Sequence, residues 1–328
     1  MDSFACHQYY REGKIMLEIK NLYKYYGKFA ALDGLNLSIK KGELFGFVGP
    51  NGAGKTTTMR IISGLLQADG GSVYIDGVDA LKDIRHLKNK IGYMPDFFGV
   101  YDNLKVMEYM DFYASIYGLT GKSAKSLCLE LLDLVHLSDK TQRYVDDLSR
   151  GMKQRLCLAR CLIHKPELLI LDEPASGLDP RARFEMKEIL KNLIDMDKTI
   201  LISSHILPEL AEMCTSIGVI QSGQMVLCGA VDEILSMMAS ANPLVITMLS
   251  ETERAVAFLK KQPLVETLSY KDNTIRVDFR GDALDEAALL SNMVSQDLPV
   301  CAFTREEGSL ESLFIQITQN GGGTFYAN

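Results

Sequence analysis

The sequence predicts an α/β domain followed by a smaller α+β domain. From Leu17 to about Gly229, short apolar strands alternate with helices, which is the pattern of an α/β fold. After Gly229 the predicted order changes to strand, helix, strand, strand, helix, strand. The 328 residues, 47% of them hydrophobic, are enough for one large and one smaller packed core.

The segment 1–15 shows no clear periodicity, whereas Met16 opens a well-patterned strand over 16–22. We expect residues 1–15 to be a disordered extension outside the fold, with the native protein starting at either Met1 or Met16. A short ordered arm is the alternative interpretation. N-terminal sequencing of the native protein distinguishes the two.

The α/β part combines buried strands with helices. Short, nearly continuous apolar runs indicate strands buried on both faces, as in a parallel sheet covered by helices. These runs lie at 42–49, 168–174 and 198–205, and a closing hairpin lies at 217–229 with its turn at Ser222-Gly223. Helices are predicted at 57–66, 106–119 and 125–137. The last two belong to a helical insertion over about residues 97–160.

The C-terminal part begins after a linker. Residues 231–243 form this linker, a helix over 231–240 that ends before Asn242-Pro243. The domain over 244–319 matches a ferredoxin-like α+β fold. Its strands are predicted at 244–249, 264–270, 274–279 and 300–306, and its helices at 251–262, 283–294 and 309–318. Residues 320–328 are expected to be a flexible tail.

Charge and hydropathy exclude some functions. The formal net charge of −7 gives no electrostatic reason to expect nucleic acid as a partner. The sequence contains no recognisable signal peptide and no apolar run long enough to cross a bilayer. We therefore do not expect the chain to form a membrane channel by itself.

A glycine-rich run lies between the strand at 42–49 and the helix at 57–66. Residues 49–56 read GPNGAGKT and fit the phosphate-binding pattern GxxxxGK[ST]. Its glycines let backbone N–H groups turn inward and form an anion cradle at a helix N-terminus. Lys55 is expected to reach the β and γ phosphates, and the Thr56 hydroxyl to ligate Mg²⁺. The flanking strand and helix favour nucleotide binding over a merely structural turn.

Two acidic residues, Asp172 and Glu173, directly follow the apolar run 168–171. Ionised carboxylates are costly to desolvate unless something positive meets them. A magnesium nucleotide at the phosphate-binding loop supplies that partner. Asp172 can then hold Mg²⁺ through its water shell, and Glu173 can accept a proton from an attacking water. Two solvated acids at a strand end are the structural alternative.

The stretch LSRGMKQRL, residues 148–156, resembles the signature LSGGQ of ABC transporter ATP-binding subunits. This signature is far more specific than a phosphate loop. With the other motifs, the chain resembles this family from about Met16 to about Gly229. The resemblance implies a P-loop ABC ATPase domain over 16–230 that contains a helical signature subdomain over 97–160.

The resemblance also implies a dimer. In the family, Ser149 and the Gly151 backbone would sit at a helix N-terminus aimed at the γ-phosphate of the opposing subunit's nucleotide. Two subunits then sandwich two ATP molecules, and neither site is complete until the chains meet. The second subunit can be another copy or a different ABC ATPase. Asp179, in the loop 176–179 that crosses the interface, is expected to be structural and communicative.

Other family positions carry over to this chain. Tyr26 corresponds to the aromatic residue that stacks on adenine, and adjacent Tyr25 is the alternative if the register slips. His205 corresponds to the switch histidine that contacts the γ-phosphate and orients the lytic water, although a lone histidine at a strand end is often structural. The implied ATP-binding set is Tyr26, Gly49, Asn51, Gly52, Ala53, Gly54, Lys55, Thr56 and Thr57.

Two positions depart from the family pattern. Asp96 stands where the family usually has a glutamine that ligates Mg²⁺ and senses the membrane partner. An aspartate oxygen can still ligate Mg²⁺, so the expected metal set is Thr56, Asp96 and Asp172; displacement of Asp96 into a surface turn is the alternative. Met152 replaces the signature glutamine, which matters less because the phosphate contacts belong to Ser149 and Gly151.

The aromatic residues near Asp96 suggest a partner. In ABC ATPases the helical subdomain forms a groove for a short cytoplasmic helix of the permease, and Phe97, Phe98 and Tyr101 are the candidates for that contact. A core role is the alternative for the aromatic residues of this segment. The expected partner is a permease on a separate chain, which places this protein at the cytoplasmic face of the cell membrane, bound peripherally.

The direction of transport is inferred from the C-terminal domain. Similar extensions occur on ATP subunits of bacterial exporters, and SLESLFIQIT resembles their ending, so export is favoured. The domain itself carries no catalytic pattern and is expected to support dimerisation or regulation. The alternative function is that of a soluble ABC-type ATPase that acts on the ribosome or on nucleic acid. The sequence does not identify the transported substrate.

Overall fold

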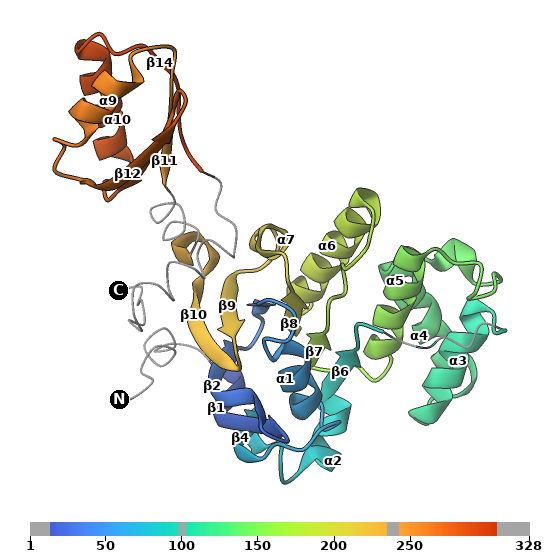
Figure 1. Cartoon of the computed structure of the whole chain (residues 1–328). Helices are drawn as coiled ribbons and strands as arrows, with labels where there is room; N and C mark the ends of the chain where they lie inside the picture. Colours follow the sequence, from blue (N-terminus) through green and yellow to red (C-terminus); the bar gives the residue numbers. More distant parts are fainter. Residues whose placement is uncertain (1–13, 98, 100–102, 235–242, 307–328) are drawn as a thin grey trace. The chain divides into compact units, whose positions relative to one another are not determined.

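The computed structural model describes residues 14–97, 99, 103–234 and 243–306. These residues fall into two compact units, one up to Val231 and one from Asp232 onward. Figure 1 shows both units. The predicted helix at 309–318, the tail at 320–328 and nearly all of the N-terminal extension lie outside the described residues.

A six-stranded sheet in the first unit carries the candidate motifs. Its strand order is β10-β9-β3-β8-β7-β6, with β6, β7, β8, β3 and β9 parallel and β10 antiparallel to β9. The strands are β3 (Leu44–Val48), β6 (Ile91–Met94), β7 (Leu168–Leu171), β8 (Thr199–Ser204), β9 (Ser216–Gln221) and β10 (Gln224–Ala230). Every residue of β3, β7 and β8 is buried, as the apolar runs predicted.

A second, antiparallel sheet packs in the same unit. Its order is β2-β1-β4-β5. The strands are β1 (Ile15–Tyr26), β2 (Phe29–Lys40), β4 (Gly70–Ile75) and β5 (Val78–Asp79). Apolar side chains of β1, β2, β3, β4 and helix α1 join in one buried cluster that includes Phe45 and Met59. The structure places the start of strand β1 at Ile15, one residue before the expected start at Met16.

Helices of the first unit connect and cover these strands. They are α1 (Lys55–Ile62), α2 (Ile84–Leu87), α6 (Pro180–Asp195) and α7 (Leu207–Ala211), with a short 3₁₀ turn η1 (Lys88–Lys90). Helix α6 starts with Pro180 at its first turn, and the Asp179 carboxylate accepts a hydrogen bond from the Ala182 N–H at 2.9 Å. Both features favour a helix start at this point.

Three further helices form a cluster of their own (Figure 1). They are α3 (Val106–Ile116), α4 (Gly121–Leu134) and α5 (Arg150–Leu162), with a 3₁₀ turn η2 (Ser138–Lys140). Buried Arg155 on α5 donates to the Val135 carbonyl at the end of α4 at 2.8 Å and pairs with Glu185 of α6 at 3.0 Å. Arg155 therefore ties α5 to both neighbouring helices.

The described part of the second unit has the order strand, helix, strand, strand, helix, strand. It comprises β11 (Leu244–Met248), α9 (Thr252–Leu259), β12 (Val265–Lys271), β13 (Thr274–Phe279), α10 (Ala283–Ser295) and β14 (Val300–Arg305). The antiparallel sheet runs β12-β13-β11-β14, so the two central strands are the first and third of the unit. Alternate residues of β11 and β13 enter a core closed by α9 and α10.

No helix in the described ranges combines the length and the hydropathy needed to cross a bilayer.

Candidate functional site

Four neighbouring parallel strands end at one edge of the six-stranded sheet. In the order β3, β8, β7 and β6, they are followed by the glycine-rich loop, His205, the acid pair and Asp96. Ligands of open α/β sheets bind at the carboxyl ends of the strands. The sheet therefore gathers motifs that are up to about 150 residues apart in the sequence.

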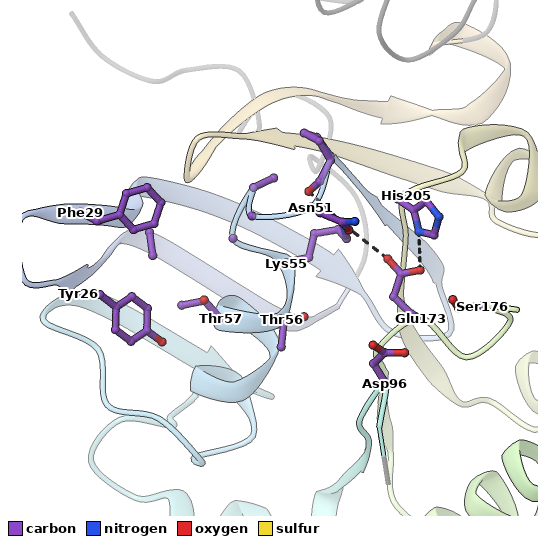
Figure 2. Close-up of a pocket in the computed structure, with 15 residues that line it drawn as sticks. Tyr26, Phe29, Asn51, Lys55, Thr56, Thr57, Asp96, Glu173, Ser176 and His205 are labelled. Carbon is purple, nitrogen blue, oxygen red and sulfur yellow. Dashed lines mark hydrogen bonds and ion pairs between the residues drawn. The ribbon is translucent and has the colours of Figure 1, made fainter.

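The loops at this edge enclose a pocket of about 300 Å³. Figure 2 shows Tyr26 and Phe29 on one side of the glycine-rich loop and His205, Glu173 and Asp96 on the other. The lining residues are Tyr26, Phe29, Ala31, Pro50, Asn51, Gly52, Ala53, Gly54, Lys55, Thr56, Thr57, Asp96, Glu173, Ser176 and His205. Of the predicted ATP-binding residues, Gly49 alone is absent from this lining.

The glycine-rich loop needs glycine at particular positions. Gly54 has φ +113° at the start of α1, a conformation that side-chain-bearing residues rarely adopt. A methyl group on Gly49 would lie 2.4 Å from the Ile220 carbonyl oxygen, so the start of the loop lies directly beside the backbone of β9. These two positions bring the loop backbone close to the sheet and leave its inner side open to the pocket.

Lys55 occupies the centre of the site. Its Nζ donates to the carbonyl oxygens of Gly49 at 2.6 Å and Pro50 at 3.3 Å, and lies 3.6 Å from Glu173 Oε1. Burial lowers the pKa of Lys55, while the charges of Glu173 and Asp172 act in the opposite direction. The ammonium group is thus the cation that meets the two acids after β7.

Asp172 is almost fully buried, with 1% of its surface exposed. Its Oδ1 accepts a hydrogen bond from the Ser203 hydroxyl at 2.7 Å. Its Oδ2 has no hydrogen-bond partner among the described residues, although the atom is buried. A buried carboxylate oxygen without a partner is costly in free energy. Such an oxygen can coordinate a cation or accept a hydrogen bond from a cation-bound water.

Glu173 lies beside the lysine and the histidine. Its backbone has φ +51°, and its N–H donates to the Ser203 Oγ at 2.9 Å. Its Oε2 lies 2.9 Å from His205 Nδ1 (Figure 2). The carboxylate therefore has one oxygen near Lys55 and the other on His205, and both predicted hydrolytic residues face the same pocket.

Asp96 lies in this pocket, after strand β6, rather than in a turn directed away from it. Asp96 remains exposed on one side, but partial desolvation raises its pKa, and the nearby carboxylates of Asp172 and Glu173 raise it further. Arg150 and His205 act in the opposite direction. The negative charges of three carboxylates thus gather near the glycine-rich loop.

The aromatic end of the pocket is formed by Tyr26 and Phe29. Tyr26 ends β1 and Phe29 opens β2, so the tight turn between them places both rings at one end of the pocket. Tyr25 does not line the pocket; its ring stacks with Tyr23 at a centroid distance of 6.4 Å. The position of the rings supports Tyr26 over Tyr25 as the predicted adenine contact.

The residues of the predicted signature lie elsewhere. Ser149 caps helix α5, where its hydroxyl accepts from the Met152 N–H at 3.4 Å. Gly151 packs so closely on α6 that a methyl group there would lie 2.8 Å from the Ala182 Cβ. Neither Ser149 nor Gly151 lines the pocket of its own chain.

The predicted permease contact can be assessed at one residue. Phe97 follows Asp96 and has 89% of its surface exposed, so it contributes little to the core. Phe98 and Tyr101 lie outside the described residues.

Comparison with known proteins shows the family of this chain. Residues 32–176 match the ABC transporter family. The chain is 35% identical over 314 residues to the bacitracin transport ATP-binding protein BcrA of Bacillus licheniformis, covering 94% of this chain and 98% of that protein. It is 32% identical over 305 residues to the linearmycin resistance ATP-binding protein LnrL of Bacillus subtilis (strain 168), covering 92% and 98%.

The protein belongs to the ABC transporter ATP-binding subunits.

Solved structures of the family have the same fold. A dimeric bacterial ABC transporter cassette superimposes with a TM-score of 0.61 at 26% identity, over 66% of this chain and 99% of that one. The same cassette, in a dimeric post-hydrolysis state with ADP and phosphate, gives a TM-score of 0.60. This ABC subunit therefore has a nucleotide-binding ATPase cassette, as its motifs predicted.

Sequence reasoning missed some residues of the site. Phe29 and Ser176 line the pocket, and Ser203 hydrogen-bonds to both members of the acid pair. Phe29 could have been predicted from the sequence, because it lies three residues after Tyr26 across a Gly-Lys turn. Ser203 could not, since its contact depends on how β8 pairs with β7.

Proposed function

We propose that this ABC subunit hydrolyses ATP with Glu173 as general base and uses the energy of nucleotide binding to drive a separate membrane permease that exports its substrate. The observation that carries the proposal is the chain of contacts from Lys55 through Glu173 to His205 inside one pocket. It joins a phosphate-binding cation to an acid and a histidine suited to activating water.

ATP binds along the length of the pocket in this proposal. The adenine stacks on Tyr26, with Phe29 alongside, and the triphosphate follows the N–H groups of the glycine-rich loop to Lys55. The open arrangement of the pocket supports this order, because aromatic rings stand at one end and the hydrolytic residues at the other. A helix N-terminus adds further stabilisation for the phosphates.

The residues present fit a bound Mg²⁺ ion. Asp172 offers a buried oxygen that lacks a protein partner, and Thr56 and Asp96 offer further oxygens at the pocket. Oxygen donors of this kind suit a hard cation. When bound with ATP, Mg²⁺ neutralises phosphate charge. Thr56, Asp96 and Asp172 are the groups through which the chain would hold it.

Hydrolysis is assigned to Glu173 and His205. Glu173 accepts a proton from the attacking water, and its two oxygens are already directed by Lys55 and His205. His205, through the imidazole edge not used by Glu173, is free to contact the γ-phosphate. The bond from the Glu173 N–H to Ser203 holds the strained backbone from which this carboxylate projects.

The opposing subunit completes the site. Because Ser149 and Gly151 do not line the pocket of their own chain, they are available to the nucleotide of another subunit. A related cassette was solved as a dimer. We propose that this chain pairs with a second copy or with another ABC ATPase, and that Asp179 lies at the interface between them.

Transport is the proposed use of this cycle. Relatives are described as resistance, Nod factor export and bacitracin transport ATP-binding proteins. Exposed Phe97, next to the pocket residue Asp96, supports a permease contact that also uses Phe98 and Tyr101. Such a subunit works at the cytoplasmic face of the cell membrane, where domain closure would rotate the permease.

Two substitutions test the proposal. Lys55→Ala should weaken ATP binding strongly, because it removes the cation that meets the phosphates. Glu173→Gln should leave ATP binding near that of the wild type and reduce turnover by roughly 10²- to 10⁴-fold. Equilibrium binding of ATP and steady-state ATP hydrolysis, with the permease present, measure both effects. Fast turnover in the Glu173→Gln protein would remove Glu173 from the role of general base.

A further inference from the structure

One buried hydroxyl joins both acids of the site. Ser203, next to the last residue of β8, has 1% of its surface exposed. Its Oγ donates to Asp172 Oδ1 at 2.7 Å and accepts from the Glu173 N–H at 2.9 Å. Since a hydroxyl has one proton to donate, Ser203 uses its donor on the first acid and an acceptor position on the second.

Strand pairing brings this hydroxyl to the acid pair. Strands β7 and β8 are parallel, and their register pairs Leu171 with Ile202. The next residues along the two strands are Asp172 and Ser203, which are consequently neighbours at the edge where the strands end. The contact is thus built into the sheet and does not depend on a mobile loop.

The hydroxyl also selects which oxygen of Asp172 remains available. Oδ1 is held by Ser203, whereas Oδ2 is buried without a partner among the described residues. On the other side of the hydroxyl, the Glu173 backbone has φ +51°, which a non-glycine residue rarely adopts without support. Loss of the Ser203 hydroxyl would therefore remove a hydrogen bond from the Asp172 carboxylate and another from the Glu173 backbone.

We propose that Ser203 is a positioning residue of the ATPase: it orients the Asp172 carboxylate toward the metal and holds the Glu173 backbone in the conformation that directs its carboxylate to the lytic water. Ser203 touches neither nucleotide nor water in this account and acts only through the two acids. The inference rests on the proposed ATP hydrolysis and adds a further residue to that site.

The test compares Ser203→Ala with the wild-type full chain. The Mg²⁺ concentration that half-saturates MgATP binding should rise roughly 10-fold, the size that loss of an outer-shell partner of a metal ligand typically causes. The kcat should fall by a similar factor, with little change in KM. ATP binding in EDTA should stay at the wild-type value, because the glycine-rich loop and Lys55 are unchanged. Ser203→Cys, which keeps a side chain of similar size but a weaker donor, should change the same quantities in the same direction.

A matched control exists on the same strand. Thr199 is fully buried at the opposite end of β8, and its hydroxyl accepts from the Gly42 N–H at 3.0 Å. Thr199→Val removes a buried, hydrogen-bonded hydroxyl without touching the acids. Its Mg²⁺ dependence and kcat should match the wild type even if its thermal stability falls.

The results separate this inference from the proposed function. If the wild type hydrolyses ATP with Mg²⁺ while both Ser203 variants keep its Mg²⁺ dependence and kcat, the positioning role is wrong and the proposed function stands. The role is also wrong if Thr199→Val reproduces the defect, because the effect would then come from strand stability. If the wild type shows no Mg²⁺-dependent hydrolysis with its permease, the proposed function itself fails.

Discussion

At the scale of single residues, Glu173 has a backbone conformation that is unfavourable unless neighbouring residues stabilise it. Glu173 adopts a left-handed backbone conformation and still points its side chain at Lys55 and His205. Strain of this kind persists where neighbouring contacts determine the geometry, and it often accompanies function. The bonds to Ser203 and His205 provide that support here.

Asp96 gives a prediction about pH. Its pKa is raised above the ordinary value of 3.8 by partial desolvation and by the neighbouring Asp172 and Glu173. A raised carboxyl pKa means that the fold disfavours the charged form, so the penalty is full above the folded pKa and disappears below the unfolded one. Asp96→Asn should therefore raise the melting temperature of the nucleotide-free protein at about pH 7. The gain should shrink as the pH falls toward about 4.

Thermal unfolding over this pH range measures the effect. A lower melting temperature for Asp96→Asn at neutral pH, or a difference that does not change with pH, would contradict the account. Mg²⁺ titrations of ATP hydrolysis test the proposed metal role separately. Wild-type Mg²⁺ dependence in both Asp96→Asn and Asp96→Ala would exclude it.

Tyr26 gives a second prediction at this scale. Tyr26→Ala should weaken ATP binding by about 1 kcal/mol, the usual value of a stacking contact, which is roughly a fivefold change in Kd. Tyr25→Ala is the matched control, because Tyr25 is also partly exposed but stacks on Tyr23 away from the pocket. Equal losses in the two variants, measured by equilibrium ATP binding, would show that the adenine contact is assigned wrongly.

At the scale of elements, helix starts and strand ends place the chemistry. Helices α1, α5 and α6 begin at the glycine-rich loop, at Ser149 and at Asp179. Each of these starts is also a position that the family resemblance assigned to the nucleotide or the dimer interface. The N-terminal turns of these helices therefore have a structural role and a proposed functional role at the same time.

Asp179 allows the two roles to be separated. Asp179→Ala removes the cap of α6 and should destabilise the protein by about 1 kcal/mol, whereas Asp179→Asn keeps a capping oxygen and should cost less. If Asp179 also acts at the interface through its charge, the stable Asn variant should still lose cooperative ATP hydrolysis. Chemical denaturation and ATPase assays with the permease measure the two effects. Wild-type ATPase activity in Asp179→Asn would show that Asp179 acts as a helix cap and has no role at the interface through its charge.

At the scale of the whole molecule, the features that could be predicted from the sequence are those that lie within a short stretch of it. The glycine-rich loop, the acids after β7 and the histidine after β8 each lie in a local pattern, and parallel strands bring their ends to one edge. The order of elements in the second unit follows from the same kind of alternation. These features need no knowledge of side-chain contacts.

Contacts between distant segments could not be predicted in the same way. The bonds of Ser203 to the acid pair require the register of β7 and β8, which the apolar runs do not specify. The choice between Tyr26 and Tyr25 depends on where the β1–β2 turn directs each ring. Long-range pairing and turn geometry were therefore the information that the structure added.

The central claim is that each ATP is held between Lys55 of one subunit and the Ser149–Gly151 helix tip of the other. The most direct test is the mass in solution of the Glu173→Gln chain with ATP and Mg²⁺, with the permease added in a parallel sample, measured by analytical ultracentrifugation. The account predicts a species of twice the 36.5 kDa chain mass, which Ser149→Arg abolishes while ATP binding to the monomer remains. A Glu173→Gln protein that stays monomeric under both conditions would contradict pairing with a second copy of the chain, and a Ser149→Arg variant that dimerises equally well would contradict the proposed ATP-binding interface itself.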